Sequence, residues 1–116
     1  EAKEVIGDVD GRLCVLTDDM IDTGGTITSA AELLVKRGAT EVWAMATHGV
    51  LSGAAVDRLK NSDIARIVLT NTLPLPADKQ IDKIEVLSIA PILARALSAV
   101  FDDESVSEIF DGENLA

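Results

Sequence analysis

The 116-residue sequence is poor in the features that mark membrane, secreted and disulfide-bonded proteins. No apolar stretch approaches the roughly 20 residues that a membrane-spanning helix needs, so we expect no membrane partner. No signal-peptide pattern opens the chain, and we expect a cytoplasmic location. Cys14 is the single cysteine, which excludes an internal disulfide and fits a core thiol of a cytoplasmic protein.

Basic residues and histidine are also scarce. The chain has ten Lys and Arg residues and 20 Asp and Glu residues, so its net charge is −10 at pH 7. Binding to nucleic acid needs a basic surface, and we therefore expect no nucleic-acid partner. His48 is the only histidine and has no cysteine cluster beside it, which argues against a zinc site. A lone histidine at a strand end is more often structural than catalytic, and we assign no catalytic residue.

The chain does have enough apolar residues for one small core, because 47% of it is hydrophobic although only 3% is aromatic. Its apolar pattern alternates between the periods of strands and helices. We expect strands over residues 13–16, 41–47, 64–70 and 84–87, and helices that begin at Ile27, at Ser52 and near Pro91. A series of this kind predicts an α/β fold with a mainly parallel sheet flanked by helices.

Helical spacing predicts which side chains face the core. The core face of the first helix comprises Ile27, Ala31, Leu34 and Val35. Gly38 should end this helix, while Ser88 should cap the last one and Pro91 lie in its first turn. The core face of the last helix comprises Leu93, Ala96, Leu97, Val100 and Phe101. Residues 105–110 should add a short edge strand.

The chain is organised around residues 13–27. The apolar run from Leu13 to Leu16 is typical of a strand buried on both faces, and it ends in the acidic pair Asp18-Asp19. The string Asp-Thr-Gly-Gly-Thr follows at 22–26, directly before the first helix. Ligands of open α/β sheets bind at the carboxyl ends of strands, where glycines let backbone amides approach them closely. Such amides, with two threonine hydroxyls and a helix N-terminus, form a cradle for phosphate.

The two carboxylates beside this cradle suit sugar hydroxyls, or a magnesium ion that a phosphorylated ligand brings with it. A sugar phosphate is therefore the predicted ligand. Asp, Thr and Gly are also ordinary turn and cap residues, which is the alternative interpretation. The complete string is more elaborate than a plain turn requires, and it favours a binding site.

The residues Thr17-Asp-Asp-Met-Ile-Asp-Thr-Gly-Gly-Thr-Ile27 closely resemble the phosphoribosyl pyrophosphate (PRPP) binding motif of type I phosphoribosyltransferase folds. Residues 46–53, residues 68–74, and Glu104 to Ser107 with Phe110 resemble ribose-phosphate pyrophosphokinases, also called PRPP synthetases. The resemblance covers essentially the whole chain but only the C-terminal portion of that longer enzyme. It implies a type I phosphoribosyltransferase-like fold, with residues 1–116 as a C-terminal domain fragment.

The resemblance also implies a reaction and roles in it. Enzymes of this family transfer a pyrophosphoryl group from ATP to ribose 5-phosphate, which gives PRPP and AMP. The residues implied in holding the 5-phosphate are Asp22, Thr23, Gly24, Gly25 and Thr26. Asp18 and Asp19 would bind the ribose hydroxyls, directly or through Mg²⁺. ATP would bind mostly to the N-terminal portion, so we expect this chain alone to be inactive.

A homo-oligomer with nucleotide effectors at a subunit interface is a further implication of the resemblance. The residues that match this effector segment are Ser105, Val106, Ser107 and Phe110. From the residues alone, an ordinary edge strand with a polar face is the favoured interpretation of the segment.

Two other functions remain to be weighed. A phosphoribosyltransferase that joins PRPP to a nucleobase would use the same loop, but it needs a hood over the base that we do not find. A phosphorylatable receiver domain also has an acidic pair after its first strand, yet it needs an acceptor Asp at another strand end. The corresponding ends here read Thr47-His48 and Thr70-Asn71, so we set the receiver aside.

Overall fold

The computed structural model describes residues 5–102, which form one four-stranded sheet and three α-helices. The elements in chain order are β1 (Leu13–Ile21), α1 (Gly25–Lys36), β2 (Glu41–Gly49), α2 (Ala55–Lys60), β3 (Ile64–Thr70), the 3₁₀ turn η1 (Ala77–Lys79), β4 (Ile84–Leu87) and α3 (Ala90–Phe101). The strand order is β1-β2-β3-β4, and all three neighbouring pairs are parallel. The predicted α/β fold with a parallel sheet is therefore confirmed.

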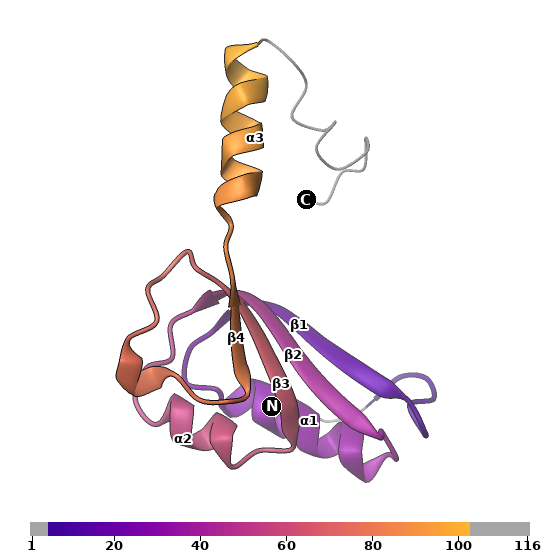
Figure 1. Cartoon of the computed structure of the whole chain (residues 1–116). Coiled ribbons are helices and arrows are strands. Elements are labelled where there is room, and N and C mark those ends of the chain that lie inside the picture. Colours follow the sequence, from indigo (N-terminus) through magenta and orange to yellow (C-terminus); the bar gives the residue numbers. More distant parts are fainter. Residues whose placement is uncertain (1–4, 103–116) are drawn as a thin grey trace.

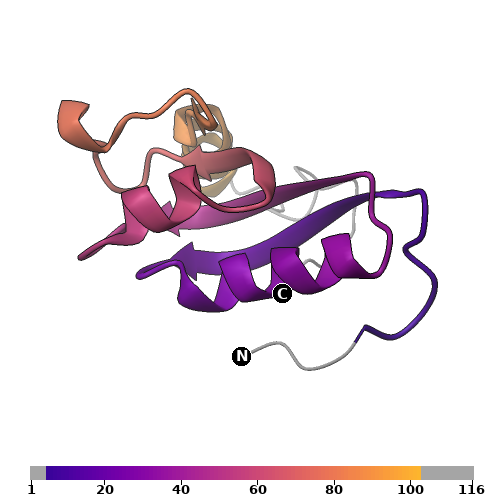
Figure 2. The ribbon, with the colours of Figure 1, turned by 90° about the horizontal axis from the view of Figure 1, so that it is seen from below.

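Both α1 and α2 lie against the same face of the sheet (Figures 1 and 2). This follows from the topology, because right-handed crossovers between successive neighbouring strands put each helix on one side. The core fills the space between this face and the two helices. Its fully buried side chains include Ala31 of α1, Val42 and Ala44 of β2, Leu59 of α2, and Ile64 and Ile67 of β3.

The opposite face of the sheet is not covered by a helix within residues 5–102 (Figure 2). Leu13 and Val15 keep 49% and 45% of their surface exposed, so the prediction of a first strand buried on both faces is wrong for this part of the chain. The Arg66 guanidinium lies 5.1 Å from the centre of the Trp43 ring and 3.2 Å from Glu85. Side chains alternate between the two faces of a strand, so only every second one faces the helices and the others stay exposed.

Helix α3 projects beyond the carboxyl edge of the sheet at the end of an extended segment (Figure 1). The core face predicted for it is wrong here, since Leu97 and Phe101 keep 59% and 86% of their surface exposed and only Ala99 of the helix is buried. Helical spacing identified the apolar side of α3 but not a surface to cover it. Pro91 lies in the first turn as predicted, whereas Ile89 rather than Ser88 is the N-cap.

The bounds of the other elements agree in part with the predicted ones. The bounds of β3 and β4 match the predicted ones, and α1 ends before Gly38 as expected, although Val35 is exposed. Helix α2 begins at Ala55, three residues later than predicted from Ser52. The predicted edge strand at 105–110 and the effector residues Ser105, Val106, Ser107 and Phe110 lie outside the described residues. Among the helices described, none has the length and apolar character needed to cross a membrane.

Candidate functional site

The acidic pair lies inside strand β1 and does not follow it. The strand continues to Ile21, with Asp18 opposite Ala46 and Met20 opposite His48 of β2. The expectation that the strand ends at the pair is therefore wrong, because ladder hydrogen bonds join backbone groups and tolerate polar side chains on an exposed edge strand. Successive residues of a strand alternate between its two faces, yet the Asp18 and Asp19 side chains remain within hydrogen-bonding reach of each other.

Asp19 is held in its ionised form. A hydrogen bond with the Asp18 side chain, and a second one with the Met20 amide, lower the pKa of Asp19 from its ordinary value of 3.8. His48 adds a smaller electrostatic contribution in the same direction. The Asp18 carboxylate in turn accepts a hydrogen bond of 2.7 Å from the Asp19 amide. An ionised, exposed carboxylate of this kind can accept hydrogen bonds from hydroxyls or contact a cation, and it repels phosphate.

The loop after β1 leads directly into helix α1. Gly24 is the N-cap residue of α1, and its φ of 82° lies in the left-handed region that glycine adopts without strain. No side chain of residues 5–102 caps the helix, so toward this part of the chain the amides of its first turn, from Gly25 onward, are free to bind a ligand. The same end of the helix carries the positive end of its dipole. Helix α1 begins two residues before Ile27, and Gly25 and Thr26 are part of its first turn.

Residues 50–52, which follow β2, hydrogen-bond to the backbone of this loop. The amides of Val50 and Leu51 donate to the Ile21 carbonyl at 3.0 and 3.1 Å, and the Ser52 amide donates to the Asp22 carbonyl at 3.0 Å. The Ser52 hydroxyl also donates to the Asp22 carboxylate. Asp22 therefore has a structural partner, which its position in the loop did not reveal.

Arg58 of α2 makes the next contact of this series. Its guanidinium donates to the carbonyl oxygen of Thr23, 35 residues away in the sequence. Within α1, the Thr28 hydroxyl donates to the Gly24 carbonyl at 2.7 Å. Sequence reasoning missed Ser52 and Arg58 as loop contacts, since nothing local in residues 50–60 relates them to a loop 30 residues earlier.

Two hollows meet at Asp18. The first has a volume of about 180 Å³ and lies over the loop, and its lining comprises Asp18, Met20, Ile21 and residues 22–27. The second has a volume of about 260 Å³, and its lining includes Asp18, Thr47 and Thr70 at the carboxyl ends of β1, β2 and β3. Asp19 lines neither of them. The structure thus brings Asp18 together with Asp22, Thr23, Gly24, Gly25 and Thr26 around one hollow, whereas Asp19 contacts Asp18 but does not line that hollow.

His48 has a structural partner at the same edge of the sheet. Its Nδ1 lies 2.8 Å from the Thr72 hydroxyl oxygen, and the ring is half-buried. The hydroxyls of Thr70 and Thr72 both donate to the Thr47 carbonyl, at 2.6 and 3.3 Å. These contacts tie the ends of β2 and β3 together, which agrees with a structural role for the histidine.

Comparison with known proteins identifies relatives over nearly the whole chain. Residues 2–111 match the family model described as the phosphoribosyl synthetase-associated domain. The ribose-phosphate pyrophosphokinase of Streptomyces coelicolor is 61% identical over 108 residues, which cover 93% of this chain and 33% of that protein. The Clostridium acetobutylicum enzyme of the same name is 55% identical over 113 residues, or 97% of this chain and 35% of that protein.

A solved structure agrees with the sequence comparisons. The crystal structure of phosphoribosylpyrophosphate synthetase from Mycobacterium smegmatis superposes with a TM-score of 0.80 at 52% identity, covering 84% of this chain and 33% of that one. The chain therefore spans about a third of the length of these relatives. The resemblance noted from the sequence is confirmed: the chain belongs to the phosphoribosyl synthetase-associated domain family and is homologous to ribose-phosphate pyrophosphokinases.

Proposed function

We propose that this chain is the ribose 5-phosphate-binding part of a ribose-phosphate pyrophosphokinase that acts in nucleotide biosynthesis. The observation that carries the proposal is the uncapped N-terminus of α1 behind Gly24, in the same hollow as the Asp18 carboxylate. A phosphate accepts hydrogen bonds from such amides and is favoured by the helix dipole. A ribose hydroxyl can donate to the neighbouring carboxylate. One hollow thus suits both ends of a sugar phosphate.

The loop would hold the 5-phosphate through the first-turn amides of α1 and the Thr26 hydroxyl, which lines the hollow. Asp22 and Thr23 would contribute mainly through their backbone, because Ser52 and Arg58 already engage the Asp22 side chain and the Thr23 carbonyl. Asp18 would bind the ribose hydroxyls, since it lines both hollows. Ribose would then extend from the loop toward the ends of β2 and β3.

Magnesium suits this site only as a companion of the substrate. Within residues 5–102, no group of three or more His, Cys, Asp or Glu side chains is arranged to hold a metal ion. Mg²⁺ in phosphoryl-transfer sites takes one or two carboxylates and completes its shell with phosphate oxygens and water. Asp18 and Asp19 supply hard oxygen ligands of this type and would hold it. The ion, when bound, would neutralise negative charge on the phosphates.

The reaction would depend on positioning and charge neutralisation. The anomeric hydroxyl oxygen of ribose 5-phosphate would form a bond to the β-phosphorus of ATP and lose its proton to water. The bond between that phosphorus and the bridging oxygen to the α-phosphate would break, and AMP would leave with the bridging oxygen. This chain would fix the ribose so that the anomeric hydroxyl is presented to ATP. We further propose that residues 1–116 form the C-terminal domain of a cytoplasmic homo-oligomer, that most ATP contacts lie in the remainder, and that this chain alone is inactive.

Titration of the chain with ribose 5-phosphate, with and without Mg²⁺, tests the binding role. Amide NMR shifts should concentrate on residues 23–26, and ribose without phosphate should not reproduce them. An absence of these shifts at millimolar ligand would overturn the proposal. The catalytic part is tested in a chimera in which this chain replaces the matching third of the Streptomyces coelicolor enzyme. The chimera should form PRPP and AMP from ATP, and the chain alone should form neither.

A further inference from the structure

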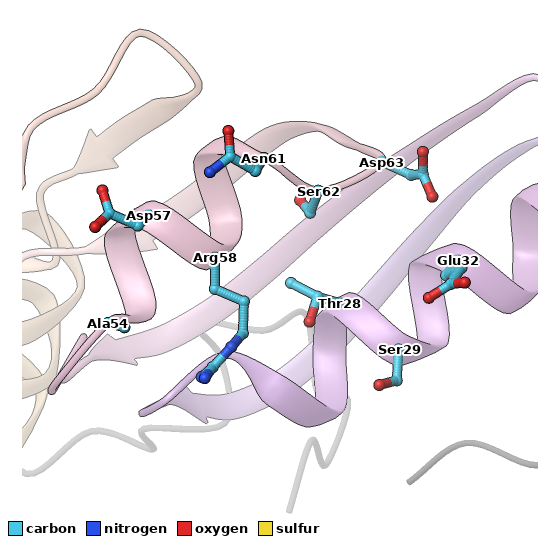
Figure 3. A pocket seen from close by; sticks show the side chains of 9 residues that line it. All are labelled: Thr28, Ser29, Glu32, Ala54, Asp57, Arg58, Asn61, Ser62 and Asp63. Atoms are coloured by element: carbon cyan, nitrogen blue, oxygen red, sulfur yellow. The ribbon is translucent and has the colours of Figure 1, made fainter.

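We propose that Arg58 is a positioning residue of the phosphate-binding loop, which it orients through the Thr23 carbonyl. The inference rests on the proposed function only for the identity of the ligand. Arg58 belongs to α2, and its side chain extends from this helix toward the junction of β1 and α1 (Figure 3). There its guanidinium donates to the carbonyl oxygen of Thr23.

Three successive carbonyl groups of the junction accept hydrogen bonds from residues 50–58. The Ile21 and Asp22 carbonyls accept from backbone amides, which any sequence could supply. The Thr23 carbonyl accepts from the Arg58 side chain, so this contact alone among the three depends on the identity of one residue. Substitution of Arg58 can therefore change how this carbonyl is held while the backbone contacts to the other two remain.

The contact fixes more than one carbonyl. The peptide unit between Thr23 and Gly24 is planar and trans, so its C=O and N–H groups point in opposite directions. Holding the Thr23 oxygen toward Arg58 thereby sets the direction of the Gly24 amide, and Gly24 lines the hollow over the loop. The Gly24 carbonyl is already held by the Thr28 amide and hydroxyl, so the freedom that the Arg58 contact removes is rotation of the preceding peptide unit, which glycine permits more readily than other residues. A fixed amide binds an anion without first losing conformational entropy.

The charges around Arg58 bear on whether it acts by positioning the loop or by attracting the phosphate electrostatically. The side chain lies in a groove of about 600 Å³ between α1 and α2, where Glu32, Asp57 and Asp63 also line the surface (Figure 3). Glu32 pairs with Lys36 at 3.2 Å and Lys83 lies within the electrostatic reach of Asp63, so the charges in and around this groove largely cancel. Arg58 therefore does not form a positive patch that attracts phosphate, and its effect should come from the hydrogen bond to the loop.

Three variants of the full 116-residue chain test the inference. Arg58→Met removes the donor and keeps a long side chain, Arg58→Lys keeps the charge and one possible donor, and Lys60→Met removes the same charge from the same helix. We measure ¹⁵N order parameters of residues 23–25 without ligand, the Kd for ribose 5-phosphate, and Tm. Arg58→Met should lower the order parameters and weaken binding about tenfold, the scale of a hydrogen bond to a charged group.

The pattern across the variants decides the outcome. Support requires that Lys60→Met resemble the parent chain and that Arg58→Lys fall between the parent and Arg58→Met. The inference is overturned if Arg58→Met and Lys60→Met are alike, or if Arg58→Met lowers only Tm. If the parent chain does not bind ribose 5-phosphate but Arg58→Met still loosens residues 23–25, the positioning role stands and the proposed function fails. Should Arg58→Met unfold, the order parameters and affinity of Arg58→Lys decide between these results.

Discussion

The Ser52 hydroxyl donates a hydrogen bond to the Asp22 carboxylate and joins two residues that are 30 apart in the sequence. Asp22 is the first residue of the string that predicted the phosphate site, and the family resemblance implied that it helps to hold the phosphate. Its partner instead comes from the segment before α2. The Asp22 carboxylate therefore stabilises the loop through Ser52, and the backbone amides around it are the groups that can bind an anion.

Replacing Asp22 separates these two roles. Asp22→Asn keeps an oxygen that can accept from Ser52, so the free energy of unfolding should change by less than about 0.5 kcal/mol. Asp22→Ala leaves the Ser52 hydroxyl without its acceptor and should lower that free energy by about 1 kcal/mol. Urea denaturation of both variants measures the difference. Equal stabilities for the Asn and Ala variants would contradict a bracing role for this carboxylate.

The lowered pKa of Asp19 predicts how the chain responds to acid. Its carboxyl should titrate below 3.8 in the folded chain, because the hydrogen bond that it shares with the Asp18 side chain and the one from the Met20 amide favour the ionised form. The stability that this adds is complete above 3.8, the unfolded value, and is lost as pH falls through the lower folded value. Carboxyl ¹³C shifts follow the titration directly. Asp18→Ala removes the largest cause and should raise the midpoint, whereas the urea-unfolded chain should return the ordinary value.

Gly49 at the end of β2 should resist any larger side chain. A Cβ at this position would lie 2.6 Å from Cδ1 of Leu69, which is 2% exposed and has little room to move. Overpacking of this kind destabilises a core by about 1–3 kcal/mol, and we expect that loss of unfolding free energy for Gly49→Ala. Gly25→Ala is the matched control, since its Cβ would meet nothing closer than 3.9 Å. Similar stabilities for the two variants would contradict the close packing.

The sequence was informative about elements with sharp local boundaries. Residues 64–70 and 84–87 are β3 and β4 as predicted, because an apolar run bounded by polar and turn residues specifies a strand locally. The end of β1 was not predictable in this way. Pairing with β2 continues through Asp18 and Asp19, since the partner strand supplies the hydrogen bonds whatever the side chains are.

In the candidate site, too, some features were predictable from the local sequence and others depend on residues far away in the chain. The residues of the loop and Asp18 follow one another closely, and their gathering in one hollow was predictable from strand and helix order. Arg58 and Ser52 reach the loop only after the chain has crossed the sheet and returned, so no spacing rule connects them to it. The apolar face of α3 was likewise visible in the sequence, but what covers a face depends on residues far from it.

Thr26 should contribute to binding more than to stability. Its side chain is exposed and lines the hollow over the loop, within the first turn of α1. Thr26→Val keeps the shape and removes the hydroxyl, so ribose 5-phosphate should bind more weakly by about 1 kcal/mol or more. Isothermal titration measures the change. Thr40→Val, an exposed threonine immediately before β2, is the control and should leave both affinity and Tm unchanged.

Asp18 and Asp19 differ in their position, and substitution should reveal the difference. Asp18 lines both hollows, whereas Asp19 lines neither, so contact with ribose is expected of the first and a role with Mg²⁺ of both. In the chimera with the Streptomyces coelicolor enzyme, each Asn variant should fold normally and lose activity. Loss of one charge-assisted contact of about 1.5–3 kcal/mol at the transition state lowers the rate by about 10- to 150-fold.

The magnesium dependence separates the two carboxylates. Raising the Mg²⁺ concentration should recover part of the activity of Asp19→Asn, whose loss comes from a weaker hold on the ion. Asp18→Asn should recover less, because it also loses a contact with the ribose hydroxyls, and its KM for ribose 5-phosphate should rise. Asp78→Asn, in the exposed turn η1, is the control for a lost surface charge. Parent rates in both site variants, with unchanged Tm, would mean that the acidic pair is structural and that the sugar is bound elsewhere.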